Sequence, residues 1–166
     1  MIRTATAEDV PAIHRLVCEL AEYERAHHDV EATPEQLREA LFGPDPTVFA
    51  HVAEAAPAGG GAGEVVGFAL WFLNFSTWRG RNGIYLEDLY VQPEHRGSGL
   101  GRELLTELAR ICVERGYTRL EWSVLDWNEP ARGFYRALGA VSMDEWTVFR
   151  LTGDALTRLG STGTGA

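Results

Sequence analysis

The sequence contains no lysine, so arginine supplies all 15 of its positively charged side chains. The absence of lysine excludes catalysis through a lysine Schiff base. With 24 acidic residues the formal net charge is −9, which argues against a nucleic-acid-binding protein, because such proteins present a basic face to the phosphate backbone. The same charge disfavours adhesion to anionic membranes. It suits a cationic small molecule, although an acidic isoelectric point is also ordinary for a soluble protein.

Cysteine is scarce and long apolar runs are missing. Cys18 and Cys112 lie far apart, each within an apolar stripe of helical spacing, which excludes a disulfide framework and a zinc site and predicts two buried, reduced thiols. No apolar run reaches the ~18 residues of a membrane span, and the first residues lack the apolar core of a signal peptide. We therefore expect a soluble, cytoplasmic protein with no metal and no membrane partner.

The 166 residues have room for one domain, which we expect at 1–155, followed by a flexible tail at 156–166. The apolar periodicity predicts an α/β protein with a mixed sheet of six or seven strands, flanked by about four helices. The Gly/Ala-rich segment 56–63 is expected to be a solvated hairpin connection. Strands are expected at 2–5, 48–55, 64–75, 83–91, 120–124 and 146–151, and helices from about 7 to 24, 34 to 42, 102 to 115 and 130 to 138.

A glycine-rich turn, Arg96-Gly97-Ser98-Gly99-Leu100-Gly101, directly precedes the long amphipathic helix. Glycine lets a backbone approach a ligand closely, and the first turn of a helix presents unpaired N–H groups and a partial positive charge. Together with the guanidinium of Arg96 these groups form a cradle for a pyrophosphate. A dinucleotide-binding fingerprint has a different glycine spacing and follows the first strand, and no Walker A loop is present. A plain glycine-rich connection is the other interpretation.

The order of segments around this turn resembles that of the GNAT-superfamily acyl-CoA N-acyltransferases, over roughly residues 2–151. Residues 96–101 fit the R/Q-x-x-G-x-G/A signature of that family. The resemblance implies a GNAT fold, with a sheet splayed in the middle, acetyl-CoA as cosubstrate, and transfer to a primary amine of a small molecule. Within the superfamily the chain is most similar to the spermidine/spermine (diamine) and thialysine N-acetyltransferases, through residues 21–24, 85–91, 127–130 and 134–135.

Transfer of an acyl group from a thioester to an amine requires a base, an oxyanion-stabilising group and an acid, because an alkylammonium is almost entirely protonated at neutral pH. The resemblance implies direct attack by the amine, with Glu87 as a base acting through water and Tyr135 as the acid. A carboxylate inside an apolar strand is costly without a function or a partner, which supports Glu87. For Tyr135 the alternative is a buried Phe-Tyr pair that closes a helix. Asp88 binds either a distal ammonium or a structural arginine.

The remaining expected site residues follow from the resemblance. It implies that strand residues 89–91 pair with the pantetheine arm, with the N–H of Leu89 facing the thioester oxygen, and that Asn128 also bonds this arm. From composition alone, these residues would be a core strand and a helix N-cap. The acetyl-CoA group comprises Leu89, Tyr90, Val91, Arg96, Gly97, Ser98, Gly99, Leu100, Gly101, Asn128 and Tyr135; the acceptor group comprises Tyr23, Glu24, Glu87, Asp88, Asp144 and Trp146.

Two departures from the family pattern bear on the acceptor. Asp144 and Glu145 precede Trp146, where the family has a glutamate two positions before its tryptophan. Arg79 and Arg81 add positive charge; if they face the acceptor pocket, an amine that also carries a carboxylate, such as thialysine, becomes more plausible than a bare polyamine. A protein or peptide N-acetyltransferase and a non-catalytic acyl-CoA sensor are the alternative functions. The family also implies a homodimer, with strand exchange near the C-terminus.

Overall fold

The structure is a computed structural model in which residues 1–55 and 63–161 are described. The expected hairpin connection at 56–63 therefore lies almost entirely outside the described residues. The chain divides into two compact units, Met1–Ser123 and Val124–Ala166, and each is described by itself. The division into a domain at 1–155 and a tail remains a prediction.

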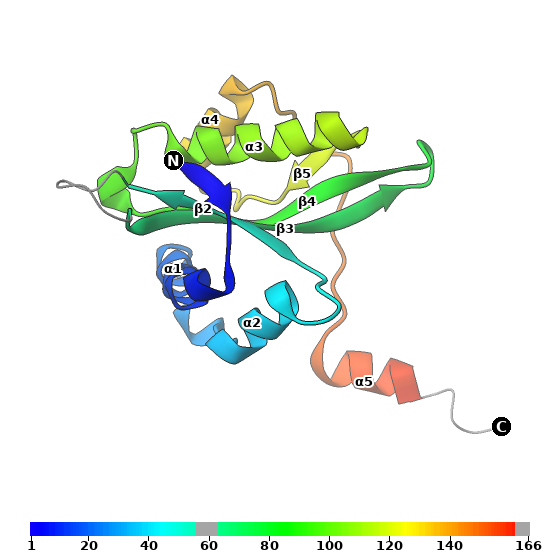
Figure 1. Ribbon diagram of the computed structural model, residues 1–166. Helices are drawn as coiled ribbons and strands as arrows, with labels where there is room; N and C mark the ends of the chain where they lie inside the picture. The colour runs from blue at the N-terminus through cyan, green and yellow to red at the C-terminus, as the bar shows by residue number, and fades with distance from the viewer. Residues whose placement is uncertain (56–62, 162–166) are drawn as a thin grey trace. The chain divides into compact units, whose positions relative to one another are not determined.

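The first unit is built on one mixed five-stranded sheet with the strand order β1-β2-β3-β4-β5 (Figure 1). Neighbouring strands are antiparallel except β4 and β5, which are parallel. A parallel pair needs a crossover, and the helix α3 supplies it. The strands are β1 (Ile2–Thr4), β2 (Phe49–Glu54), β3 (Val65–Ser76), β4 (Arg81–Val91) and β5 (Leu120–Trp122).

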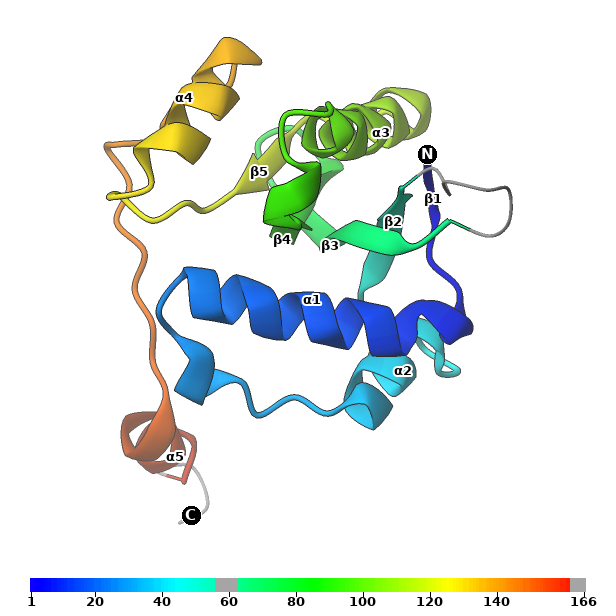
Figure 2. The ribbon, with the colours of Figure 1, turned by 90° about the vertical axis from the view of Figure 1, so that its left-hand side faces the viewer.

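Helices cover both faces of this sheet. α1 (Val10–Tyr23) and α2 (Pro34–Phe42) lie on one face and α3 (Leu100–Arg115) on the other, as two perpendicular views show (Figures 1 and 2). Short 3-10 turns η1 (Ala7–Asp9), η2 (His27–Asp29) and η3 (Pro93–His95) connect these elements.

The apolar stripes predicted from the sequence bury the helices against the sheet. On one face Ile13 and Leu16 of α1 pack in a core cluster with Phe68 of β3. In α3, Leu104 and Leu108 are likewise fully buried. Burial of each such side chain stabilises the fold by about 1.5–3 kcal/mol. The predicted free thiols are also found, with Cys112 buried in α3 and Cys18 partly buried in α1.

Two irregularities of β4 open the middle of the sheet. Leu70 of β3 pairs with Asp88, but the next residue, Trp71, pairs with Leu86. Glu87 is therefore an extra residue in β4, a β-bulge. On the other edge of β4, pairing with β5 ends at Leu86. Beyond this point no described strand pairs with that edge of β4, so its backbone groups are open there. The splay of the sheet stays a prediction.

The second unit contains α4 (Glu129–Ala137) and α5 (Gly153–Ser161). The predicted strand at 146–151 is wrong, because this segment has no regular structure in the described chain. Its alternating apolar residues match a strand, but a strand also needs a neighbour to pair with. The sheet thus has five strands instead of six or seven. The described chain has five α-helices, and α5 forms within the Gly/Thr/Ser-rich end, where the sequence predicted no helix.

No helix in the described part of the chain is both long and apolar enough to cross a membrane.

Candidate active site around the end of strand β4

The glycine turn joins the end of β4 to α3. Gly97 and Gly99 have φ angles of 78° and 94°, in the left-handed region that glycine adopts without strain. No described heavy atom lies within 4 Å of where a Cβ would sit on either residue. The hydroxyl of Ser98 donates to the carbonyl of His95 at 2.6 Å, which closes the turn. Gly99 is the N-cap of α3, so the first N–H groups of this helix are available to an anion.

Arg96, the first residue of the turn, lies between two aromatic rings. Its guanidinium carbon is 4.9 Å from the centroid of the Tyr23 ring and 5.4 Å from that of the Tyr90 ring. Its Nε donates to the carbonyl of Val91 at 2.9 Å. The sequence assigned Tyr23 to the acceptor and Tyr90 to acetyl-CoA. Sequence reasoning missed the stack that joins them, because it depends on residues far apart in the chain.

At the end of β4, the backbone N–H and C=O groups of successive residues point alternately toward β3 and away from it. The N–H of Gln92 donates to Val66 of β3 at 2.9 Å. Because these groups alternate in direction along a strand, the peptide groups of Leu89 and Val91 point away from β3, toward the open edge. The Val91 carbonyl accepts its bond from Arg96 there. An extended molecule could pair with this edge as an added strand.

Beside the bulge, the charges of Glu24 and Glu87 act on a third carboxyl group, that of Asp88. Glu87 is exposed, and Asp88 is partly buried. Burial raises the pKa of Asp88 to about 6, with further contributions from the charges of Glu87 and Glu24. Burial also raises the pKa of Glu24, which directly follows α1. The fold therefore brings together three of the predicted acceptor residues, and their combined charge favours a cation.

Four predicted site residues belong to the second unit. Asn128 is the N-cap of α4, where its Oδ1 accepts from the N–H of Ala131 at 3.3 Å. Tyr135 lies on α4 with its ring 5.4 Å from that of Phe134. Asp144 accepts from the hydroxyl of Ser142 at 3.0 Å, and Trp146 is exposed. Their roles toward the residues of the first unit stay predictions.

Arg79 and Arg81 lie at the tip of the β3–β4 hairpin. An Nη atom of Arg81 is 3.7 Å from where a Cβ would sit on Gly116, the C-cap of α3, an end of the helix that favours a cation. Arg81 and Glu87 are six positions apart along the strand, roughly 20 Å. Arg81 is thus placed to complement the helix end, and it does not contribute to the carboxylate group.

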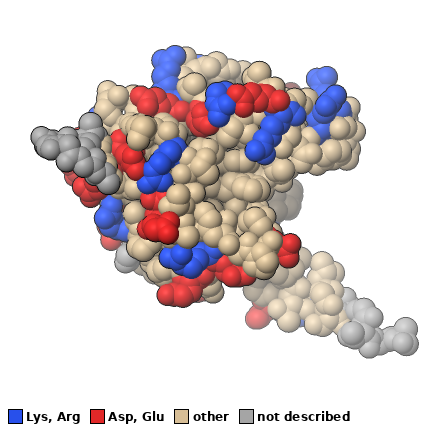
Figure 3. All heavy atoms as spheres, in the orientation of Figure 1, with Lys and Arg blue, Asp and Glu red and all other residues tan. Residues whose placement is uncertain are grey.

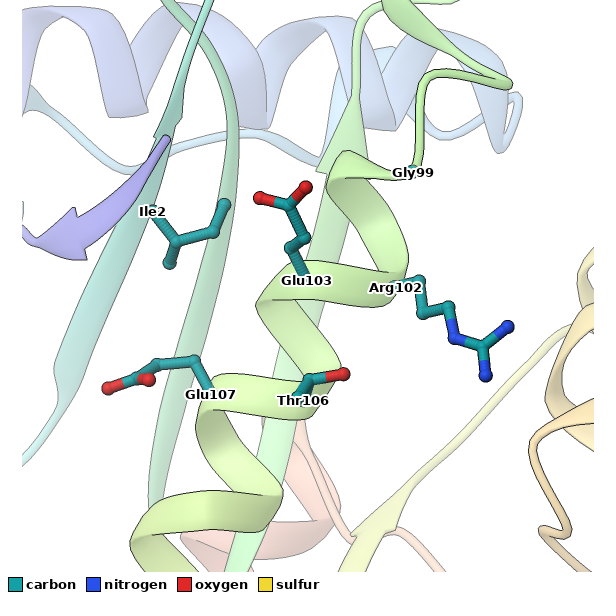
Figure 4. A pocket seen from close by; sticks show the side chains of 6 residues that line it. All are labelled: Ile2, Gly99, Arg102, Glu103, Thr106 and Glu107. Atoms are coloured by element: carbon teal, nitrogen blue, oxygen red, sulfur yellow. The ribbon is translucent and has the colours of Figure 1, made fainter.

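Arg102 is a cation near the turn that the sequence analysis missed. It lies in the first turn of α3 and lines an open hollow of about 460 Å³ together with Gly99 and Glu103. Figure 4 shows its side chain extending away from Ile2 and Glu103. A cation in a first helical turn opposes the helix dipole. An arginine in the first turn of a predicted helix was therefore the signal in the sequence for an anion site, because a bound anion would offset the unfavourable interaction of Arg102 with the helix dipole.

Within the described residues no group of three or more His, Cys, Asp or Glu side chains has an arrangement that could hold a metal ion.

Comparison with known proteins gives a consistent picture. The profile of the Acetyltransferase (GNAT) family matches residues 10–140. A thialysine N-epsilon-acetyltransferase from Bos taurus is 43% identical over 164 residues, which cover 96% of each chain. An L-ornithine N5-acetyltransferase from Arabidopsis thaliana is 33% identical over 196 residues, covering 93% of this chain and 85% of that one. The solved structure of an integron cassette protein from V. cholerae has a TM-score of 0.77 at 25% identity, covering 98% of both chains.

Proposed function

The chain belongs to the GNAT acetyltransferase family, and from this premise we propose that it acetylates a primary amine of a small, amino-acid-like molecule such as thialysine or ornithine. The family uses acetyl-CoA as its cosubstrate, and its members are acyltransferases. Relatives named for thialysine and for ornithine support this class of acceptor. A diamine or polyamine is the neighbouring possibility within the same chemistry.

The observation that carries the proposal is the group formed by Glu24, Glu87 and Asp88 at the bulge of β4. A carboxylate group of this kind attracts an alkylammonium, and the bulge leaves Glu87 exposed. The open edge at Leu89 and Val91 begins two residues further along the same strand. Acceptor and acyl donor would therefore meet on one strand.

The proposed reaction proceeds by direct attack. Glu87 accepts a proton from the ammonium through a water molecule, and the neutral nitrogen then attacks the thioester carbonyl carbon. The N–H of Leu89 donates to the oxygen of the tetrahedral intermediate. The carbon–sulfur bond breaks, and the hydroxyl of Tyr135 gives its proton to the leaving thiolate. The nitrogen releases its second proton to water to give the neutral amide, and the Tyr135 phenolate regains a proton from water. No covalent enzyme intermediate forms, and Cys112, whose thiol pKa is raised by burial, takes no part.

The substitution Glu87→Gln tests the base. We expect kcat/KM for thialysine at pH 7 to fall by about 100-fold, with partial recovery at high pH, where the amine loses its proton without help. Glu35→Gln removes an exposed carboxylate from the first turn of α2 and is the matched control. Unchanged turnover in Glu87→Gln would remove Glu87 from the mechanism, and failure of coenzyme A to bind in calorimetry would remove the proposed function.

A panel of acceptors tests the substrate class. Acetyl-CoA turnover, followed by thiol release, should give a higher kcat/KM for thialysine and ornithine than for spermidine. Peptides with a free N-terminus or a lysine side chain should react more slowly than either amino acid. A preference for a peptide would instead identify a protein N-acetyltransferase, and binding of acetyl-CoA without turnover of any amine would identify a sensor.

We also propose that two copies of the chain form a homodimer through residues 146–151. Val148 and Phe149 in this segment are 83% and 94% exposed, and Trp146 is 67% exposed. Such a segment gains stability when it pairs with another chain. Light scattering should give twice the mass of one chain, and Phe149→Asp should shift the mass toward one chain. The two free thiols, Cys18 and Cys112, support the proposal of a reducing, cytoplasmic location.

A further inference from the structure

Three elements of the first unit meet at the guanidinium of Arg96. Tyr23 is the last residue of α1, Tyr90 lies near the end of β4, and Arg96 follows η3. The guanidinium carbon lies within 5.4 Å of both ring centroids, a range in which a cation is attracted to the face of an aromatic ring. The Nε bond to the Val91 carbonyl fixes the direction of the side chain. The stack therefore joins the end of α1 to the glycine turn.

A second contact ties the same part of α1 to Gln92, the residue that directly follows β4. The amide nitrogen of Gln92 donates to both carboxylate oxygens of Glu19, at 3.1 and 3.2 Å. Glu19 lies one helical turn before Tyr23, on the same side of α1. Glu24 comes directly after Tyr23. Its position beside Asp88 therefore depends on how the end of α1 is held.

The backbone of the turn controls where Arg96 lies. Gly97, the next residue, has a positive φ, and so has Gly99. An anion bound by the N–H groups of the turn and of α3 restricts this backbone. Restricting the backbone holds Arg96, and Arg96 in turn holds Tyr23 and the residue that follows it.

We propose that the stack of Tyr23, Arg96 and Tyr90 couples the binding of acetyl-CoA to the binding of the amine. Occupation of the turn orders the end of α1 and places Glu24, so the amine binds more tightly. Because coupling between two sites is reciprocal, the amine also tightens the binding of coenzyme A. Tyr23 and Arg96 act here as positioning residues. This inference rests on the proposed function, which supplies both ligands.

Tyr23 is the informative position, because it lies outside the turn. Tyr23→Leu removes the aromatic face while keeping an apolar side chain, and Tyr23→Phe keeps the face and removes only the hydroxyl. Arg96→Gln removes the cation from the stack. Arg115→Gln removes a positive charge at the far end of α3 and serves as the charge-matched control.

The experiment measures the dissociation constant of coenzyme A by calorimetry, alone and with saturating thialysine. Coenzyme A carries no acetyl group, so no reaction occurs. We expect thialysine to lower this constant by about five-fold or more in the wild-type chain, and equally in Tyr23→Phe and Arg115→Gln. In Tyr23→Leu and in Arg96→Gln, thialysine should lower the dissociation constant of coenzyme A by less than about two-fold. The variant that carries both substitutions should show the same small factor as either single variant, because both remove the same coupling.

The outcomes separate this inference from the proposed function. Equal tightening in the wild type and in Tyr23→Leu overturns the coupling through the stack. Absence of tightening in the wild type overturns it as well, whatever the turnover assay gives. Binding of coenzyme A alone, together with acetylation of thialysine by the wild type, decides the proposed function independently. Should Tyr23→Leu fail to fold, as judged by circular dichroism, Arg96→Gln against Arg115→Gln decides the same question.

Discussion

Asp88 is a partly buried carboxyl group whose pKa is raised from 3.8 to about 6 by burial and by two neighbouring carboxylates. The folded chain holds this proton more tightly than the unfolded chain, so ionisation of Asp88 costs stability. The cost is nearly absent below about pH 3 and complete above about pH 7.

Asp88→Asn should therefore stabilise the protein at pH 8, by about 1–2 kcal/mol in the free energy of unfolding. At about pH 3 the difference should nearly vanish, since Asp88 is then mostly protonated in both states. Urea denaturation at the two pH values measures this. Asp29→Asn, an exposed carboxylate in η2, should show no such pH-dependent gain. A loss of stability at pH 8 in Asp88→Asn would contradict the origin given for the raised pKa.

The positive φ of Gly97 allows a test of whether the glycine turn binds coenzyme A. Its φ of 78° is costly for any residue with a Cβ, so Gly97→Ala should shift the turn or destabilise it by about 1 kcal/mol. We expect the affinity for coenzyme A, measured by calorimetry, to fall about ten-fold. Ser98→Ala removes only the hydroxyl bond to His95 and should cost less. Equal affinities in Gly97→Ala and the wild type would exclude the turn from the coenzyme site.

At the scale of whole elements, the pairing of β4 with β5 depends on a glycine. A Cβ on Gly83 would lie 2.6 Å from Cγ of Arg119 and from Oδ1 of Asn74, and 2.9 Å from the backbone oxygen of Arg119. Arg119 crosses β4 at this point and reaches β3, where its Nη2 donates to the carbonyl of Phe75. Because Gly83 has no side chain, Arg119, which directly precedes β5, can pass over β4 and bond to β3.

Gly83→Ala should lower the free energy of unfolding by about 1–3 kcal/mol, because the strands must separate to admit the methyl group. Gly133→Ala is the matched control, since α4 has open space at that position. There alanine should be neutral or stabilise the helix by about 0.5–1 kcal/mol. Thermal unfolding of both variants measures the contrast, and equal melting temperatures would refute it.

The elements that could be predicted from the sequence are those whose pattern of apolar residues lies within one continuous segment of the chain. The stripes of α1 and α3 and the apolar runs of β3 and β4 fix the ends of these elements to within three residues. The glycine turn was likewise predictable, because the turn and the helix it opens are adjacent in the chain. The bulge at Glu87, the Arg96 stack and the missing strand at 146–151 depend on partners that are distant in sequence, and no local pattern encodes them.

For the molecule as a whole, the net charge of −9 predicts opposite salt effects on its two substrates. Charges of both signs alternate on the face shown in Figure 3, so the excess acts as a long-range field. Raising the ionic strength from about 0.01 M to about 0.1 M shortens the screening length from about 30 Å to about 10 Å. The KM for a cationic amine should then rise about two-fold or more.

The KM for acetyl-CoA, an anion, should fall over the same range of salt. The two substrates thus serve as controls for each other in one set of initial-rate measurements. A parallel rise of both constants would show that salt acts on the enzyme itself and not on the encounter with its ligands.

Because of the bulge in β4, Glu87 has no register partner on β3. Leu86 and Asp88 already lie on opposite faces, through their partners Trp71 and Leu70, as direct neighbours in an unbroken strand would. A chain one residue shorter would keep every core side chain on its own side. The carboxylate that we propose as the base is thus an insertion into the strand, and it can be exchanged or removed without repacking the interior of the sheet.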